Sequence, residues 1–120
     1  MYLKSHKDLI VWQKSILLVK NIYYLTSQFP KDEIYGLSSQ MKRAAVSIPS
    51  NIAEGYSRKG TKEYSHFLRI AYGSSNELET QIIIAKDLYK NLDYNTTELL
   101  LEEILKMLNV ITEKLEKITN

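Results

Sequence analysis

Apolar residues recur at intervals of three and four along nearly the whole chain, and this spacing constrains the fold more than any other feature. It is clearest near the end, where six aliphatic residues follow one rhythm: Leu101, Ile104, Leu108, Ile111, Leu115 and Ile118. Such intervals place side chains on one face of an α-helix. Because only four glycines and two prolines are present among 120 residues, the sequence predicts a few long helices.

The residues that interrupt the pattern separate four helical segments. The first segment starts at Leu9 and ends before Pro30, whose ring cannot continue a helix. The second starts near residues 31–34, the third spans residues 61–91, and the fourth begins at a capping-box pair, Asn95 and Glu98. Short connections make neighbouring helices run in opposite directions. We therefore expect residues 1–120 to form one all-α domain, an antiparallel up-down four-helix bundle.

The first segment is apolar around about half of its circumference. One stripe consists of Leu9, Trp12, Ile16, Val19 and Tyr23, and the other of Val11, Leu18, Ile22, Leu25 and Phe29. A chain of this size has no interior large enough to bury both stripes. The pattern therefore indicates an oligomer in which this helix also faces another subunit.

Pro49 interrupts an otherwise regular second helix. The inward positions of this helix are Leu37, Met41, Ala44, Ile48 and Ile52. An interior proline removes one backbone hydrogen bond at a cost of ~3 kcal/mol, so we expect a kink at residues 45–49, with a complete break as the alternative. The other members of this kink motif are Ser47, Ser50, Asn51, Glu54 and Gly55. They either repair the freed backbone groups or line a small polar notch that a partner occupies.

Small residues gather at the centre of the third segment: Ala71, Gly73, Ser74 and Ser75. They predict a close approach by a neighbouring helix, which would offset the cost of a glycine inside a helix. The inward stripe of this segment is Tyr64, Phe67, Ala71, Ser74, Leu78, Ile82, Ala85 and Tyr89. Gly55 and Gly60 are expected to bracket the linker before it, with Gly60 or Thr61 as its cap.

Basic residues are concentrated in the first half of the chain. Residues 1–63 hold ten basic and five acidic residues, whereas residues 64–120 hold six basic and nine acidic ones, within a net charge of only +2. The candidate nucleic-acid-binding residues are Lys14, Lys20, Lys42, Arg43, Tyr56, Arg58, Lys59 and Lys62. The cations would contact phosphates and Tyr56 would stack on an unpaired base. Alternatively, these residues form solvated faces and Tyr56 packs beneath the linker.

The sequence offers little for catalysis. It has no cysteine, and its only histidines are His6 and His66. Glu63 and His66 form one Glu-x-x-His step, but di-iron bundles need two such steps and two further glutamates. Residues 55–62 space their glycines like a phosphate-binding loop, yet the Thr61-Lys62 order is reversed and no strand precedes them. We therefore expect no enzyme activity, no metal and no cofactor.

The start of the chain does not resemble a secretory signal, and no apolar run approaches the ~20 residues of a membrane-spanning helix. The sequence therefore predicts a cytoplasmic protein that does not enter a membrane.

Residues 35–55 closely resemble the signature of the family called 23S rRNA intervening sequence proteins, also labelled S23 ribosomal proteins. Segments 11–14, 25–26, 29–30 and 67–74 resemble that family in order and spacing, so the resemblance covers most of the chain. It implies a bacterial four-helix bundle that assembles as a homopentameric ring. The accessory variability determinant of diversity-generating retroelements is similar, and it binds nucleic acid and a reverse transcriptase.

The residue patterns and the family resemblance together predict a non-enzymatic, oligomeric binding module that associates with RNA or DNA through a basic surface. The alternative is a protein-interaction scaffold that docks a partner, such as a reverse transcriptase, without touching nucleic acid. The family resemblance supplies no established biochemical activity. The ring size follows from the resemblance, because periodicity indicates only association.

Overall fold

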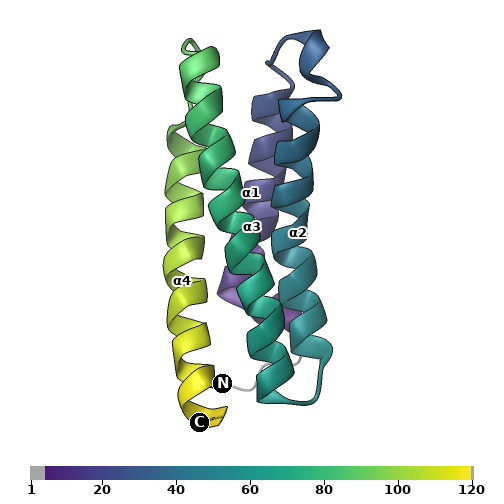
Figure 1. Ribbon diagram of the computed structural model, residues 1–120, viewed down its shortest axis with the longest axis vertical. Helices are drawn as coiled ribbons and strands as arrows, with labels where there is room; N and C mark the ends of the chain where they lie inside the picture. Colours follow the sequence, from purple (N-terminus) through teal and green to yellow (C-terminus); the bar gives the residue numbers. More distant parts are fainter. Residues whose placement is uncertain (1–4, 120) are drawn as a thin grey trace.

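The structure, a computed structural model, describes residues 5–119 and consists of four long helices. These are α1 (Ile10–Thr26), α2 (Leu37–Ser57), α3 (Thr61–Leu88) and α4 (Asn95–Thr119) (Figure 1). Two short 3-10 helices, η1 (His6–Asp8) and η2 (Lys31–Glu33), precede α1 and α2. The described residues contain no strand. The predicted all-α four-helix bundle is thus confirmed.

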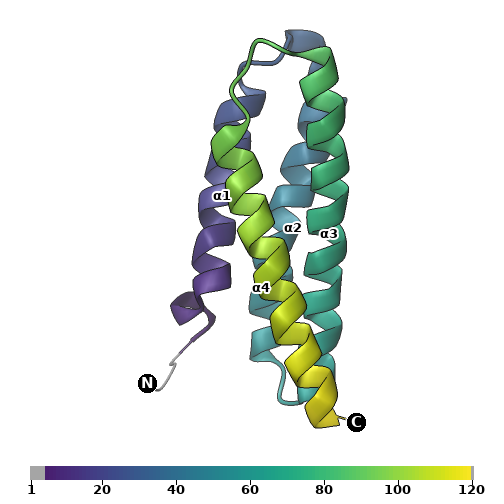
Figure 2. The same cartoon turned by 90° about the vertical axis from the view of Figure 1, so that its left-hand side faces the viewer.

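Each long helix packs against two others in a closed square. The pairs in contact are α1 with α2, α2 with α3, α3 with α4, and α4 with α1. The chain reverses direction at each connection, as the colour sequence in Figures 1 and 2 shows. The bundle measures 46 × 25 × 24 Å, and its length agrees with that of α3, because 28 helical residues extend about 42 Å. This arrangement leaves every helix with one face exposed to solvent.

Only one of the two apolar stripes of α1 lies in the core. Val11, Leu18, Ile22 and Leu25 are buried, and so is Phe29 just beyond the helix. The other stripe stays near the surface, where Leu9, Trp12, Ile16 and Val19 are half-buried and Tyr23 is exposed. One chain therefore covers this second stripe only in part: Leu9, Trp12 and Val19 pack against the edge of the core, and Tyr23 remains exposed.

The second helix begins later than the sequence predicted. Residues 31–33 form the separate turn η2, and α2 starts at Leu37. Gly36, with φ −112° and ψ −119°, departs from helical geometry. The Glu33 Oε1 atom accepts a hydrogen bond from the Leu37 N–H at 3.1 Å, so a side chain from η2 caps the first turn of α2.

The inward positions predicted for α2 are confirmed, since Met41, Ala44, Ile48 and Ile52 are buried and Leu37 is half-buried. The helix continues through Pro49, so the alternative of a complete break is wrong. The kink stays a prediction. Gly55 does not open the linker as expected, because α2 extends past it to Ser57.

Gly55 instead provides the close approach between α2 and α3. A Cβ atom at this position would lie 2.8 Å from Phe67 Cβ and 3.2 Å from the Tyr64 carbonyl oxygen. At Gly73, a Cβ would meet nothing within 4 Å, so that residue does not provide the close approach predicted for it. The inward stripe also shifts in the first half of α3, where Leu68 and Ser75 are buried and Phe67 and Ser74 are only half-buried.

The third helix ends at Leu88 rather than at residue 91. The Tyr94 hydroxyl lies within hydrogen-bond distance of the carbonyls of Ala85 (3.1 Å) and Tyr89 (2.9 Å). The Ala85 carbonyl also accepts a hydrogen bond from the Tyr89 N–H at 2.7 Å, so the Tyr94 hydroxyl adds a second contact there and also reaches the Tyr89 carbonyl just beyond the helix. This contact comes from the next connection, which explains why periodicity alone misplaced the end.

The capping box predicted at the start of α4 is wrong. The Asn95 N–H donates to Asp93 Oδ1 at 2.9 Å, and the Glu98 carboxylate accepts from Lys86 Nζ at 3.0 and 3.2 Å. Further along, the heptad rhythm follows the core only in part. Leu101, Ile104 and Leu108 are buried, but Ile118 is 70% exposed.

Candidate nucleic-acid interface

The eight residues predicted to bind nucleic acid do not form one surface. Lys14 and Lys20 lie on α1, Lys42 and Arg43 lie early on α2, and the other four lie around the connection between α2 and α3. Arg43 and Ser57 are about 21 Å apart along α2, at 1.5 Å per residue. The candidates must therefore be considered as separate groups.

The group at the connection between α2 and α3 is largely occupied by internal contacts. The Arg58 guanidinium pairs with Glu54 at 3.1 Å and with Glu63 at 3.7 Å, and it lies 5.0 Å from the centre of the Phe67 ring. Tyr56 is half-buried and meets Tyr64 edge-on, with ring centres 5.9 Å apart. The structure therefore favours the reading in which Tyr56 packs beneath the linker.

Lys59 and Lys62 in the same group are exposed and pair with no carboxylate within residues 5–119.

The two candidates on α1 differ from each other. Lys14 Nζ lies 3.0 Å from Glu103 on α4, and only 28% of the Lys14 side chain is exposed. Lys20 is exposed and makes no ion pair with the described residues. Lys14 thus joins α1 to α4 rather than facing a ligand.

Lys42 and Arg43 line an open groove on the outer face of α2. The groove has a volume of about 530 Å³, and its walls are Tyr23, Ile34, Ser39, Lys42, Arg43, Val46 and Ser47. No acidic residue lines it in the described part of the chain. Lys42 Nζ lies 5.0 Å from the centre of the Tyr23 ring, and this cation–π contact holds the ammonium group at the surface. We call this feature the α2 groove.

The kink motif borders the α2 groove through Ser47. Ser47 Oγ is 2.8 Å from Ser74 Oγ on α3, and Asn51 Nδ2 donates to the Ser47 carbonyl at 2.8 Å and to Ser47 Oγ at 2.9 Å. Ser50 is exposed, and Glu54 pairs with Arg58 rather than with the backbone near Pro49. The carbonyl that loses its helical donor at Pro49 is that of Ala45, four residues earlier, whereas Asn51 bonds to Ser47. The Asn51 bond therefore ties together the Ser47 turn and does not repair the group freed by Pro49.

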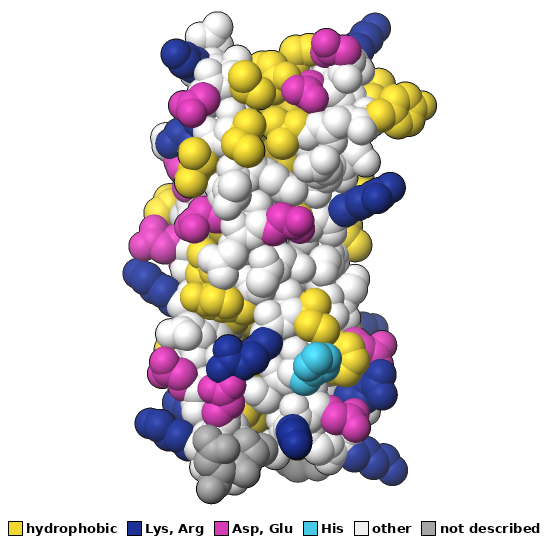
Figure 3. Space-filling view, viewed as in Figure 1, with side chains coloured by type: hydrophobic (Ala, Val, Ile, Leu, Met, Phe, Trp, Pro, Cys, Tyr) yellow, Lys and Arg dark blue, Asp and Glu magenta, His cyan; other side chains and the backbone are white. Residues whose placement is uncertain are grey.

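The charge asymmetry of the sequence becomes an asymmetry between the two sides of the bundle. The adjacent helices α1 and α2 carry four basic residues and one acidic residue, whereas α3 and α4 carry six basic and nine acidic residues. Figure 3 shows the face formed by α3 with α4 and α2 on either side, on which acidic side chains are spread along much of the length beside basic ones. The side of the bundle that holds the α2 groove is therefore the more basic one.

A second groove was not predicted from the sequence. It lies between the start of α1 and α4, has a volume of about 520 Å³, and is lined by Asp8, Leu9, Ile10, Val11, Lys106, Met107, Val110 and Ile111. Ile10 is 61% exposed and Val110 is 48% exposed. The wide apolar arc of the first helix was the signal for it. We call it the apolar groove.

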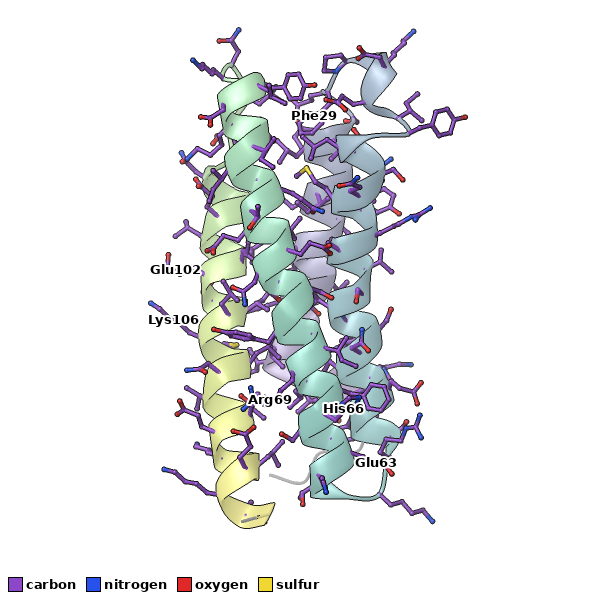
Figure 4. The ribbon with its side chains drawn as sticks, viewed as in Figure 1. Phe29, Glu63, His66, Arg69, Glu102 and Lys106 are labelled. Carbon is purple, nitrogen blue, oxygen red and sulfur yellow. The ribbon has the colours of Figure 1, made fainter. Side chains whose placement is uncertain are left out.

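The Glu-x-x-His step lies on the surface of α3, where Glu63 and His66 are both exposed (Figure 4). Within residues 5–119, no group of three or more histidine, aspartate or glutamate side chains could hold a metal ion. His6 contacts Trp12 edge-on, with ring centres 5.2 Å apart. Neither histidine is part of a cluster of titratable groups.

None of the described helices is both long and apolar enough to cross a membrane.

The fold and these surfaces together define a class of protein: a small four-helix bundle with a basic groove over α2 and an apolar groove between α1 and α4. A family model described as "23S rRNA-intervening sequence protein" matches residues 7–110. The chain belongs to this family. The match confirms the resemblance found in residues 35–55 and extends into α4. No curated protein gives a significant match to the chain.

Proposed function

We propose that the protein is a non-enzymatic, oligomeric binding module of the cytoplasm that associates with RNA or DNA through the α2 groove. One observation carries the proposal: Lys42 and Arg43 lie side by side in a groove without a carboxylate, on the basic side of the bundle. Of the other predicted cations, Arg58 and Lys14 are less suited to bind phosphate because they are paired with acidic residues. Lys20, Lys59 and Lys62 are exposed but do not line the α2 groove.

The groove suits phosphate for a simple reason. Lysine and arginine that neutralise phosphates release bound counterions, and this release drives binding. Ser39 adds a hydroxyl donor beside the two cations. A groove with two cations binds weakly by itself, but several copies in an oligomer would act together on one long ligand through their high effective concentration.

Self-association is the second part of the proposal. Ile10, Leu17 and Tyr24 recur every seven residues along α1 and are 61%, 54% and 69% exposed. Together with the apolar groove, they form an apolar surface that one chain leaves in contact with water. The family resemblance implies a pentamer, and the basic and acidic sides of the bundle would help neighbouring copies choose their orientation.

The test is a titration of fluorescently labelled structured RNA and duplex DNA, followed by anisotropy at several salt concentrations. We expect saturable binding that weakens log-linearly with salt. The double variant Lys42→Glu/Arg43→Glu should reduce affinity at least tenfold. Its matched control is Lys114→Glu/Lys117→Glu, which makes the same change of charge at exposed positions on α4. Equal losses from both variants would contradict a site in the α2 groove.

The alternative function, a scaffold for a protein partner, is favoured by the apolar groove. Six of its eight lining residues are apolar, as expected of the core of a protein interface. Absence of nucleic-acid binding even at low salt would place this scaffold function ahead. A partner pulled down by the wild-type protein but not by Val110→Glu would then support it.

A further inference from the structure

Exposed apolar and aromatic side chains surround the two cations of the α2 groove. Tyr23 is 48% exposed, Ile34 58% and Val46 40%, and all three line the groove. Tyr35, which follows Ile34 in the connection to α2, is 95% exposed. Its Cα lies within 3.8 Å of that of Ile34, because consecutive residues are joined by a trans peptide. Tyr23, Ile34 and Val46 therefore lie beside the cations, and the exposed side chain of Tyr35 begins one residue beyond the groove wall.

This combination suits unpaired nucleotides better than a duplex. In a duplex the base faces are stacked inside, so the protein meets phosphates, sugars and base edges. An unpaired strand offers base faces that stack on aromatic rings, together with phosphates that contact lysine and arginine. Only an unpaired strand would cover the exposed ring of Tyr35 as well as neutralise Lys42 and Arg43.

The spacing of the basic residues that make no ion pair also favours a single strand over a duplex as the ligand. Lys42 and Arg43 occupy one turn of α2, and Lys20 lies on α1, three residues before the groove-lining Tyr23. Lys59 and Lys62 lie beyond the far end of α2, more than about 21 Å from Arg43. Duplex affinity grows with the number of phosphates neutralised, and one turn of helix offers few cations for them. The groove volume of about 530 Å³ is within the range of pockets that hold one small ligand, about 300–1,000 Å³.

The two tyrosines have different tasks in this arrangement. The Tyr23 ring is in contact with the Lys42 ammonium group, so it positions a cation. The Tyr35 side chain is 95% exposed, so the faces of its ring are open to a stacking base. We propose that the α2 groove binds an unpaired stretch of RNA or DNA, with a base stacked on Tyr35 and the adjoining phosphates held by Lys42 and Arg43. This inference rests on the proposed function and narrows its ligand.

The experiment compares three labelled probes: a pyrimidine-rich single-stranded RNA, the DNA strand of the same sequence, and that DNA strand in a duplex. We expect both single strands to bind more tightly than the duplex. Tyr35→Ala should weaken single-strand binding about fivefold or more, since a stacked base contributes that much, and should leave duplex binding unchanged. Tyr35→Phe keeps the ring and should bind as the wild type does.

The control is Leu99→Ala, which truncates a large side chain that is 63% exposed on α4, a helix that contributes no residue to the groove. Circular dichroism checks that each variant is folded. Equal, salt-dependent binding of duplex and single strands, unaffected by Tyr35→Ala, would overturn this inference and leave the groove as a general phosphate site. Absence of salt-dependent binding to all three probes would overturn the proposed function itself, and this inference with it.

Discussion

At the scale of single residues, two glycines inside long helices have opposite surroundings. Gly55 is buried in the last turns of α2, where an added Cβ would lie 2.8 Å from Phe67 Cβ. It would also lie 3.2 Å from the Tyr64 carbonyl oxygen, which is backbone and cannot move aside easily. Gly73, in the middle of α3, is exposed and has open space where a Cβ would be.

Alanine at these two positions should therefore change stability in opposite directions. Gly55→Ala forces α2 away from α3 and should lower the free energy of unfolding by about 1–3 kcal/mol, the usual cost of overpacking. Gly73→Ala should raise it by about 0.5–1 kcal/mol, because alanine restricts the unfolded chain and favours a helix. Urea unfolding of both variants measures the effects. Equal stability of the two variants would show that α2 and α3 do not approach closely at Gly55.

At the scale of elements, Glu33 joins three parts of the chain. Its carboxylate caps α2 through the Leu37 N–H and accepts a hydrogen bond from the Tyr89 hydroxyl at the end of α3. The Tyr89 ring also packs on Phe29, with ring centres 4.8 Å apart. The bond from Tyr89, and then that from Leu37, lower the pKa of Glu33 below its ordinary value of 4.5. The same bond raises the pKa of Tyr89 to about 12.

The hydrogen bonds that the Glu33 carboxylate accepts should make the free energy of unfolding depend on pH. Since the pKa of Glu33 is lower in the folded state, its contribution is complete above the unfolded pKa and is lost as pH falls through the folded pKa. We expect Glu33→Ala to lower the free energy of unfolding at neutral pH by roughly 1 kcal/mol, as for the loss of a helix cap. The difference from the wild type should narrow in acid.

Urea unfolding at a series of pH values, from neutral to acid, measures this difference. Asp32→Ala is the matched control, because Asp32 is an exposed neighbour in η2, and it should have little effect at any pH. A difference between Glu33→Ala and the wild type that stays constant into strong acid would contradict the role assigned to the ionised carboxylate.

These end contacts also explain how far the fold could be predicted from the sequence. Periodicity identified the four helices and most of their buried faces. Leu108, for example, lies four residues after Ile104 and therefore on the same face of the helix, and both side chains are buried. It misplaced helix ends, which depend on contacts between distant segments. The Glu33 carboxylate caps the start of α2, and the Tyr94 hydroxyl contacts carbonyls at the end of α3.

The candidate site shows the same limit. Residue type and sequence position singled out Lys42 and Arg43, but not that they share a groove with Tyr23 from another helix. Nor does the sequence show that Arg58 is paired with two carboxylates and that Tyr56 is half-buried. Pairing and burial depend on how helices pack, so composition alone could not separate free cations from occupied ones.

At the scale of the whole molecule, one bundle leaves several large apolar side chains of α1 exposed to water. The apolar groove and the exposed residues Ile10 and Leu17 lie on this side, next to α4. The basic side and the acidic side of the bundle are different surfaces, so copies could meet through complementary faces. Contacts between two different faces generate a ring when the rotation closes.

If the apolar groove is the contact between copies, a charge placed in it should dissociate the oligomer. Val110→Glu puts a carboxylate where 48% of the side chain is exposed, so the chain should stay folded, with a change in stability of about 0.5 kcal/mol or less. Burying that carboxylate against another copy would be costly. Sedimentation equilibrium should therefore find an oligomer for the wild type and a smaller species for Val110→Glu at the same concentration.

Ile84→Glu is the matched control for this last experiment. Ile84 is 44% exposed, close to the value for Val110, and it lies on α3, which does not pack against α1. This variant should keep the oligomer of the wild type. If the wild type is monomeric over the whole concentration range, self-association is refuted. If Val110→Glu and Ile84→Glu dissociate the oligomer equally, then charge anywhere on the surface, rather than charge in the apolar groove, controls assembly. Loss of nucleic-acid affinity in Val110→Glu, with Lys42 and Arg43 intact, would show that binding depends on several α2 grooves acting together.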